Sequence, residues 1–180
     1  MAREVPESHP LLRLFRGLAE STFLDRLGIG DPNLVGYVSS LLARFMATGG
    51  IWDIRDDEGR SLLDVTAMIV AAESTGDPAL RRACHQHVGD FTLFWTGVYP
   101  EALAKLQRVS SADHLIDFRQ QGKRSYRLAS ETQPDDQASL LRRLSDQFEL
   151  CAFGLSCVRK EWEQLAAQTR AGHFPPRLVP

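Results

Sequence analysis

The sequence lacks the features that would place it in several large functional classes. Its 180 residues carry 21 basic and 23 acidic side chains, so the formal net charge is −2 and no block of basic residues is present. Proteins that bind nucleic acid or anionic membranes need a concentrated basic surface. No apolar run approaches the length that spans a bilayer, and residues 1–7 contain no apolar stretch typical of a signal peptide. We therefore expect a soluble, cytoplasmic protein that binds neither nucleic acid nor a membrane.

Cysteine and glycine motifs are equally sparse. The three cysteines, Cys84, Cys151 and Cys157, have no C-x-x-C spacing, so the sequence supports neither a disulfide framework nor an ordinary zinc site. The Glu-x-x-His pairs of carboxylate-bridged metal centres are missing, as is the G-x-S-x-G of serine hydrolases. Gly28 and Gly30 lie between two expected helices, which is not the context of a phosphate-binding loop. We expect no metal and no cofactor.

Helix signals are what the sequence does contain. Asp31-Pro32 and Asp77-Pro78 each offer an N-cap side chain followed by a first-turn proline, and Ser8-His9-Pro10 offers a similar start. Apolar residues recur at helical spacing after each start, which predicts an all-α fold. The expected helices begin near residues 10, 32, 61, 78 and 110 and after Pro134. Residues 51–60 are expected to form a loop or a short hairpin.

We predict a single domain over residues 1–180, built as a compact bundle of about six helices with irregular termini at 1–7 and 172–180. Gly97 and Pro100 are expected to kink or end the fourth helix. The last helix has an apolar seam with alternating spacings of three and four residues: Leu141, Leu144, Phe148, Cys151, Leu155, Val158, Trp162 and Leu165.

Such a seam is typical either of an exposed coiled coil or of a helix buried in its own domain. Leu150, Phe153 and Cys157 add apolar groups off the seam, and the small residues Ala152 and Gly154 admit a close neighbour. These additions favour a long, largely buried C-terminal helix over an exposed zipper.

The candidate site lies in the segment from His85 to Glu101, where two ionisable residues stand among aromatics. His87 and Asp90 are three residues apart and therefore neighbours on a helix. A carboxylate one turn away can orient an imidazole and raise its basicity, as a general base or a ligand site requires. The alternative is that the two side chains only satisfy each other, or backbone groups, inside the bundle.

A wider ligand site is also consistent with the sequence. Tyr99 and Glu101 follow on the same segment, and Arg119 and Tyr126 lie seven residues apart on one face of the next helix. Arg119 would hold an anionic ligand in such a site. The basic residues Arg119, Lys123, Arg124 and Arg127 could instead form a strip that binds an anion or an acidic partner, or simply a solvated helix face.

Two motifs carry a resemblance to other proteins. They are His85-x-His-x-Gly-Asp-Phe-x-Leu-Phe-Trp-Thr-Gly-Val-Tyr-Pro-Glu101 and the later Gly122-x-x-Ser-Tyr126. Together with residues 10–18 and 37–45, they make the chain up to about Ala129 similar to a group of uncharacterised bacterial proteins without an assigned activity. The resemblance implies a bacterial, soluble, stand-alone helical domain, and it assigns no catalytic role to any residue.

The sequence leaves two functional hypotheses. The first is a non-enzymatic helical interaction domain that binds a protein partner or a second copy of itself, with the seam of the last helix and Trp52 or Phe174 as the candidate surface. The second is a small-molecule-binding protein or enzyme with an internal site at His87 and Asp90.

Overall fold

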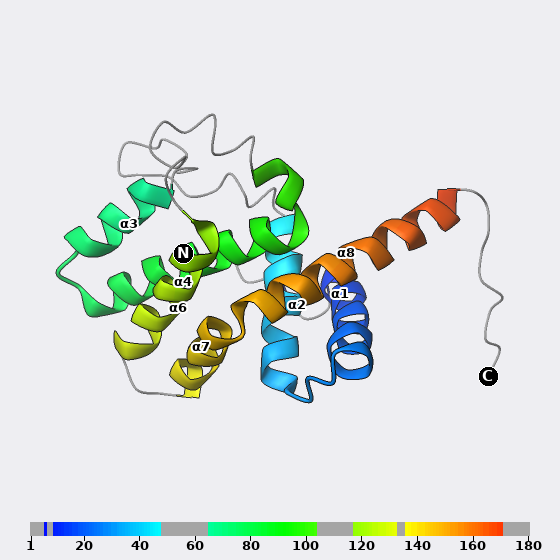
Figure 1. The fold of residues 1–180 in the computed structure, drawn as a ribbon, viewed down its shortest axis with the longest axis horizontal. Coiled ribbons are helices and arrows are strands. Elements are labelled where there is room, and N and C mark those ends of the chain that lie inside the picture. The colour runs from blue at the N-terminus through cyan, green and yellow to red at the C-terminus, as the bar shows by residue number, and fades with distance from the viewer. Residues whose placement is uncertain (1–5, 7–8, 48–64, 104–116, 133–135, 171–180) are drawn as a thin grey trace.

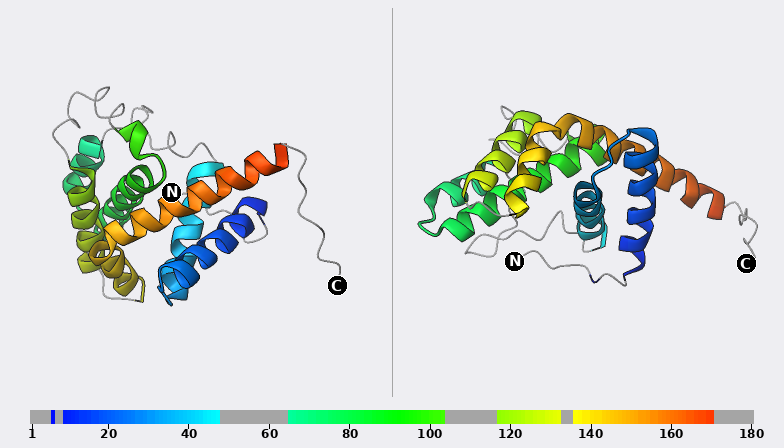
Figure 2. Two further views of the ribbon diagram at one scale, coloured as in Figure 1. Left: turned by 45° about the vertical axis from the view of Figure 1, so that its right-hand side comes forward. Right: turned by 90° about the horizontal axis from the view of Figure 1, so that it is seen from below.

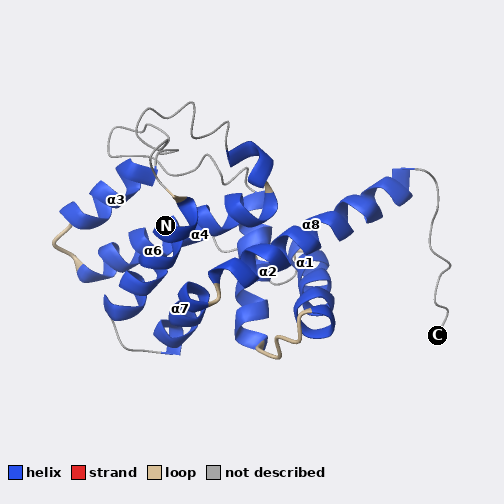
Figure 3. Ribbon diagram, in the orientation of Figure 1, coloured by secondary structure: helices blue, strands red, loops and turns tan. Residues whose placement is uncertain are grey.

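The computed structural model describes residue 6 and residues 9–47, 65–103, 117–132 and 136–170. Every regular element in these ranges is helical (Figures 1 and 3). The elements are α1 (Pro10–Glu20), the π-helix η1 (Ser21–Arg26), α2 (Pro32–Ala47), α3 (Val65–Ser74), α4 (Pro78–Val98), α6 (Phe118–Thr132), α7 (Asp136–Asp146) and α8 (Phe148–Arg170). The all-α prediction is confirmed. The expected number of about six was too low, because the described residues alone form eight helical segments.

The proline-marked starts act as the sequence predicts. The side chain of His9 accepts a hydrogen bond from the Leu11 amide at 3.2 Å, and Asp77 accepts one from the Ala79 amide at 2.9 Å. Asp31 Oδ1 accepts from the amide of Asn33 at 3.1 Å. Each cap satisfies an amide that has no partner within its helix. α4 ends at Val98, and residues 100–103 start a new helical turn, which confirms the predicted break at Pro100.

The first expected helix is divided in two by a change of pitch. After Glu20 the chain continues as the π-helix η1, where the Leu27 amide donates to the Thr22 carbonyl at 3.1 Å. The wider turn places both Thr22 and Phe23 in the interior. Phe23 packs onto Gly154 of α8 so closely that a Cβ atom there would collide with the ring. Gly28, with φ of 68°, then reverses the chain.

The last expected helix is divided as well. A turn at Gln147 separates α7 from α8, so the apolar seam continues through a change of direction. The seam residues from Leu141 to Val158 are buried. This confirms the prediction that the seam packs inside its own domain and does not form an exposed coiled coil. The prediction of a largely buried helix is wrong for the C-terminal part of α8, because this part extends beyond the other helices (Figures 1 and 2) and Leu165 is 41% exposed.

α4 lies at the centre of the core and packs against α2, α3, α6 and α8. Two glycines allow α6 to approach it closely. A Cβ atom at Gly89 would lie 2.7 Å from the Tyr126 ring, and one at Gly122 would lie 2.5 Å from Thr92 Oγ1 and collide with the Phe148 ring. Because glycine has no Cβ, these positions let aromatic rings lie directly on the opposing backbone.

Several predictions fall outside the described residues. They concern the loop or hairpin at 51–60, the helix starts at 61 and 110, Trp52, Phe174 and the two irregular termini. Among the helices that are described, none is both long and apolar enough to cross a membrane.

Candidate functional site

Asp90 is the centre of a polar network inside the helical core. Its side chain projects from the middle of α4, and the residue is 1% exposed. The phenol hydroxyls of Tyr37 and Tyr126 donate to Asp90 Oδ1 at 2.5 and 2.8 Å, and Arg44 Nη2 donates to Oδ2 at 2.8 Å. Gln86 Nε2 donates to the Tyr37 hydroxyl at 3.0 Å. The network therefore joins α2, α4 and α6 through one carboxylate.

The sequence makes this convergence possible through helical spacing. Tyr37 and Arg44 are seven residues apart on α2, so both face α4. Gln86 and Asp90 are four residues apart on α4 and present adjacent side chains to Tyr37. Tyr126 approaches from α6 over the bare backbone of Gly89.

The buried charges influence one another strongly. Burial, and then the nearby Asp90 carboxylate, raise the pKa values of Tyr37 and Tyr126 well above the ordinary value, so both phenols stay protonated and donate. Burial alone would lower the pKa of Arg44, but the ion pair with Asp90 outweighs it and the net shift is upward. The carboxylate thus accepts from three groups that keep their protons at neutral pH.

His87 stands one turn before Asp90 but takes a different position. Its ring is nearly parallel to that of Phe45, with 6.3 Å between the ring centroids and an angle of 19°. Burial, aided by Arg44 and opposed by Asp90, lowers the pKa of His87 to about 4, so the imidazole is neutral at pH 7. Its Nε2 is buried and has no hydrogen-bond partner. The hydrogen bonds of Asp90 are made to Tyr37, Tyr126 and Arg44.

Tyr99 and Glu101 belong to a second cluster, where the end of α4 meets α8. Arg159 Nη1 donates to the Val98 carbonyl at 2.6 Å and to Glu101 Oε1 at 2.5 Å, and Arg159 Nε donates to Glu163 at 2.7 Å. The guanidinium carbon lies 4.5 Å from the centre of the Tyr99 ring, a cation–π contact. Arg159 therefore caps the C-terminus of α4 and fixes it to α8.

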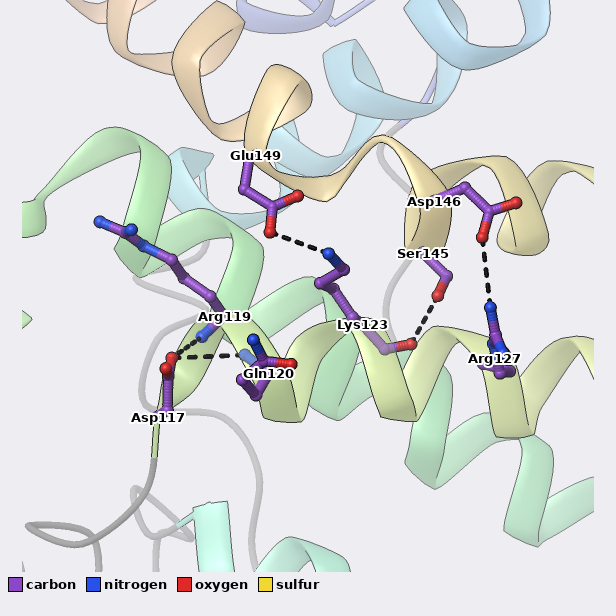
Figure 4. A network of polar contacts seen from close by, with 8 residues as sticks. All are labelled: Asp117, Arg119, Gln120, Lys123, Arg127, Ser145, Asp146 and Glu149. Atoms are coloured by element: carbon purple, nitrogen blue, oxygen red, sulfur yellow. Dashed lines mark hydrogen bonds and ion pairs between the residues drawn. The ribbon is translucent and has the colours of Figure 1, made fainter.

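Arg119 lies apart from both clusters, exposed at the start of α6. Two of the four residues of the basic strip form ion pairs (Figure 4): Lys123 pairs with Glu149 at 2.9 Å, and Arg127 pairs with Asp146 at 3.4 Å. Ser145 also donates to the Lys123 carbonyl at 2.8 Å. The hydrogen bond from Lys123 is the main cause that lowers the pKa of Glu149. These contacts connect α6 to the junction of α7 and α8.

The structure thus distributes the six predicted residues over different surroundings. Asp90 and Tyr126 share one network, with His87 beside it, while Tyr99 and Glu101 contact Arg159 and Arg119 is exposed. Sequence reasoning missed Tyr37, Arg44 and Gln86. The signal available for the first two was their spacing of seven residues on an otherwise apolar side of α2.

A different feature stands out on the surface of α8. Seven phenylalanines in the described residues are at most 4% exposed, whereas Phe153 is 55% exposed. Leu150, one turn earlier, is 40% exposed, and Cys157, one turn later, is half-buried. We call Leu150, Phe153 and Cys157 the outward face of α8.

The described residues contain no group of three or more His, Cys, Asp or Glu side chains placed to hold a metal ion. The chain as a whole matches no protein-family model, no curated protein sequence and no solved structure in the comparisons.

Proposed function

We propose that this protein is a non-enzymatic helical interaction domain that forms a homodimer through the outward face of α8. The exposure of Phe153 is the observation that carries the proposal. A phenylalanine loses about 2–3 kcal/mol of burial free energy when it stays in water, and the other phenylalanines of the described helices are buried. An aromatic ring exposed beside a second large apolar side chain is typical of a protein contact surface.

The state of the polar residues also favours an interaction domain over an enzyme. A general base needs a free lone pair that a substrate can reach. The Asp90 carboxylate already accepts hydrogen bonds from two phenols and a guanidinium inside the core. These contacts connect three helices, so the network serves the stability of the scaffold that displays α8.

The charges around Phe153 suit a second copy of the chain. In a symmetric antiparallel pair of α8 helices, positions equally far from the twofold axis face each other. With the axis midway between residues 154 and 155, Glu149 lies opposite Lys160 of the partner subunit. Phe153 then packs against the partner's Ser156, whose small side chain leaves room for the ring.

Sedimentation velocity over a range of protein concentrations tests the proposal. The unaltered chain is expected to sediment as a dimer, and Phe153→Glu as a monomer, because a carboxylate would be buried in the contact. Val70→Glu is the matched control, since Val70 on α3 is 58% exposed and also apolar. A chain that stays monomeric throughout, or equal loss of dimer in both variants, would overturn the proposal.

A charge exchange tests the antiparallel register. Glu149→Lys and Lys160→Glu each place like charges opposite one another at two symmetric positions, so each is expected to weaken the dimer. The double variant restores both pairs with reversed sign and should recover most of the affinity. If the dimer affinity of the double variant is reduced by as much as the two single variants together, the two residues do not face each other.

A second candidate function, small-molecule binding, has one observation in its favour. The Nε2 of His87 is buried without a hydrogen-bond partner beside the ring of Phe45, and buried polar atoms are normally satisfied. A planar ligand with a polar edge would supply the partner. Native mass spectrometry of the gently purified protein would show a retained small molecule that His87→Phe loses. Identical masses for the bare chain in both samples would remove this candidate.

A further inference from the structure

Two unsatisfied nitrogen atoms lie in the first half of α4, away from the network of Asp90. His85 is 2% exposed, yet its Nδ1 atom has no hydrogen-bond partner, and Arg81 Nε is also buried without one. The two residues are four apart and are therefore neighbours on one side of the helix. Because buried polar atoms are nearly always paired, these two nitrogens indicate a partner from outside the described residues.

Both side chains are already anchored through another nitrogen. His85 Nε2 lies 3.6 Å from Oε1 of Glu73 on α3. Arg81 Nη2 donates to the carbonyl of Thr75, between α3 and α4, at 2.9 Å. Each side chain is thus held in place by one nitrogen, while a second nitrogen of each is without a partner. An anchored donor binds a ligand with less loss of side-chain entropy than a free one.

The charges around His85 do not balance. Burial lowers the pKa of His85, and the Glu73 carboxylate opposes this shift. Arg81 and Arg124 lower the pKa further. Two guanidinium groups therefore act on the imidazole against one carboxylate, and the Glu73 side chain is 56% exposed. The surroundings of His85 in the described helices thus have an excess of positive charge, which favours an anion.

Arg124 brings this charge from α6. It belongs to the basic strip, in which Lys123 pairs with Glu149 and Arg127 with Asp146. Arg124 is exposed, and no carboxylate of the described residues pairs with it. Its charge nevertheless contributes to the pKa of His85. Arg124 therefore lies close enough to face the same ligand from the opposing helix.

We propose that Arg81 and His85 of α4, together with Arg124 of α6, bind the phosphate group of a small molecule. Guanidinium donors match the geometry of phosphate oxygens, and two of them balance its charge. A bound anion favours the protonated imidazole. Nδ1 of His85 then donates to a phosphate oxygen, while Nε2 carries the proton that faces Glu73. The site contains no residue of α8, so it does not depend on the proposed dimer.

NMR of the histidine side chains in the ¹⁵N-labelled full chain tests the site. Sulfate is the probe, because it has the shape of phosphate and keeps both charges throughout a pH titration. Sulfate is expected to raise the pKa of His85 by about one unit relative to chloride at equal ionic strength. His85→Gln identifies the signal, and the pKa of His87 should not change. A His85 pKa that is equal in sulfate and chloride would exclude the site.

Removal of one charge from α6 tests the contribution of Arg124. Arg124→Gln is expected to weaken sulfate binding about tenfold, the effect of one charge-assisted hydrogen bond. Arg119→Gln is the matched control, because Arg119 is exposed on the same helix and the variant loses the same charge. It should bind sulfate as the unaltered chain does. Equal weakening by both variants would show a general attraction to α6 and contradict the proposed contact.

Two further measurements define the ligand and separate this inference from the dimer. Inorganic phosphate should bind several-fold more tightly than acetate at equal ionic strength, because it offers more charge and more acceptor oxygens. Acetate binding of equal strength would contradict a phosphate site. Phe153→Glu should raise the pKa of His85 in sulfate as the unaltered chain does. Loss of the dimer with retained sulfate binding, or the reverse, therefore shows which proposal fails.

Discussion

The centre of α4 and the outward face of α8 reverse the usual placement of side chains. At the centre of α4 a charged carboxylate is 1% exposed, whereas on α8 a phenylalanine is 55% exposed. The first arrangement is stable because three donors surround Asp90. No comparable compensation exists on α8 within the described residues. The burial of Asp90 is therefore explained by donors within the fold, whereas the exposure of Phe153 is explained only if a partner covers the ring.

Removal of the Asp90 carboxylate should lower the free energy of unfolding more than a change on the outward face of α8. Asp90→Ala takes the acceptor from two buried phenols and the ionic partner from Arg44, so we expect the free energy of unfolding to fall by about 3–5 kcal/mol. Urea unfolding followed by circular dichroism measures the change. Asp90→Asn keeps the shape of the side chain but not its charge, so its free energy of unfolding should lie between those of the unaltered chain and Asp90→Ala. A loss below about 1 kcal/mol for Asp90→Ala would mean that the network contributes little to the scaffold.

The neutral imidazole beside this network makes stability depend on pH. The pKa of His87 is about 4 in the folded chain and near 6.5 when unfolded, so the unfolded chain binds more protons between these values. Stability should therefore rise with pH from about 4 to 6.5, and His87 contributes up to about 3 kcal/mol of this rise. The difference between the unaltered chain and His87→Phe isolates this part, because His85, whose pKa is also lowered, titrates in both. Parallel curves for the two proteins would contradict the burial of His87.

Because α6 packs closely on the core, an added methyl group at Gly122 should reduce stability by a moderate amount. At Gly122 an added methyl group would meet the Phe148 ring and Thr92 Oγ1, so Gly122→Ala should cost about 1–3 kcal/mol through overpacking. Gly17 on α1 is the matched control, because a Cβ atom there meets nothing within 4 Å. Gly17→Ala should stabilise the chain by up to about 1 kcal/mol through helix propensity. Thermal unfolding distinguishes the two signs, and a neutral Gly122→Ala would show that α6 can move away.

Features encoded within a few residues could be predicted from the sequence. Asp77 followed by Pro78 fixed a helix start because the cap and the first-turn proline act on adjacent amides. The burial of the seam from Leu141 to Val158 followed from its periodicity. The turn at Gln147 could not be predicted, because the apolar spacing continues through it and only the packing of α7 and α8 decides the direction.

The site was predictable only in part for a related reason. The sequence identified Asp90 as an unusual charge among aromatics, but the partners of Asp90 come from α2 and α6, 53 and 36 residues away. Periodicity describes which side chains share a face of one helix and not which helices meet. The pairing with Tyr37, Arg44 and Tyr126 therefore needed the tertiary structure, as did the exposure of Phe153, which sequence reasoning had placed in the buried middle of the last helix.

A substitution of the exposed Phe153 should have the smallest effect on stability. Phe148 and Phe153 are five residues apart on α8, and they are 0% and 55% exposed. Phe153→Ser should change the unfolding free energy of the monomer by less than about 0.5 kcal/mol, as is usual for exposed positions. Phe148→Ser should cost about 3–5 kcal/mol, as for other large core truncations. The measurement belongs at low protein concentration, where dimerisation does not add to apparent stability. If Phe153→Ser destabilised the monomer as much as Phe148→Ser, the ring would belong to the core, and its exposure could not support a dimer contact.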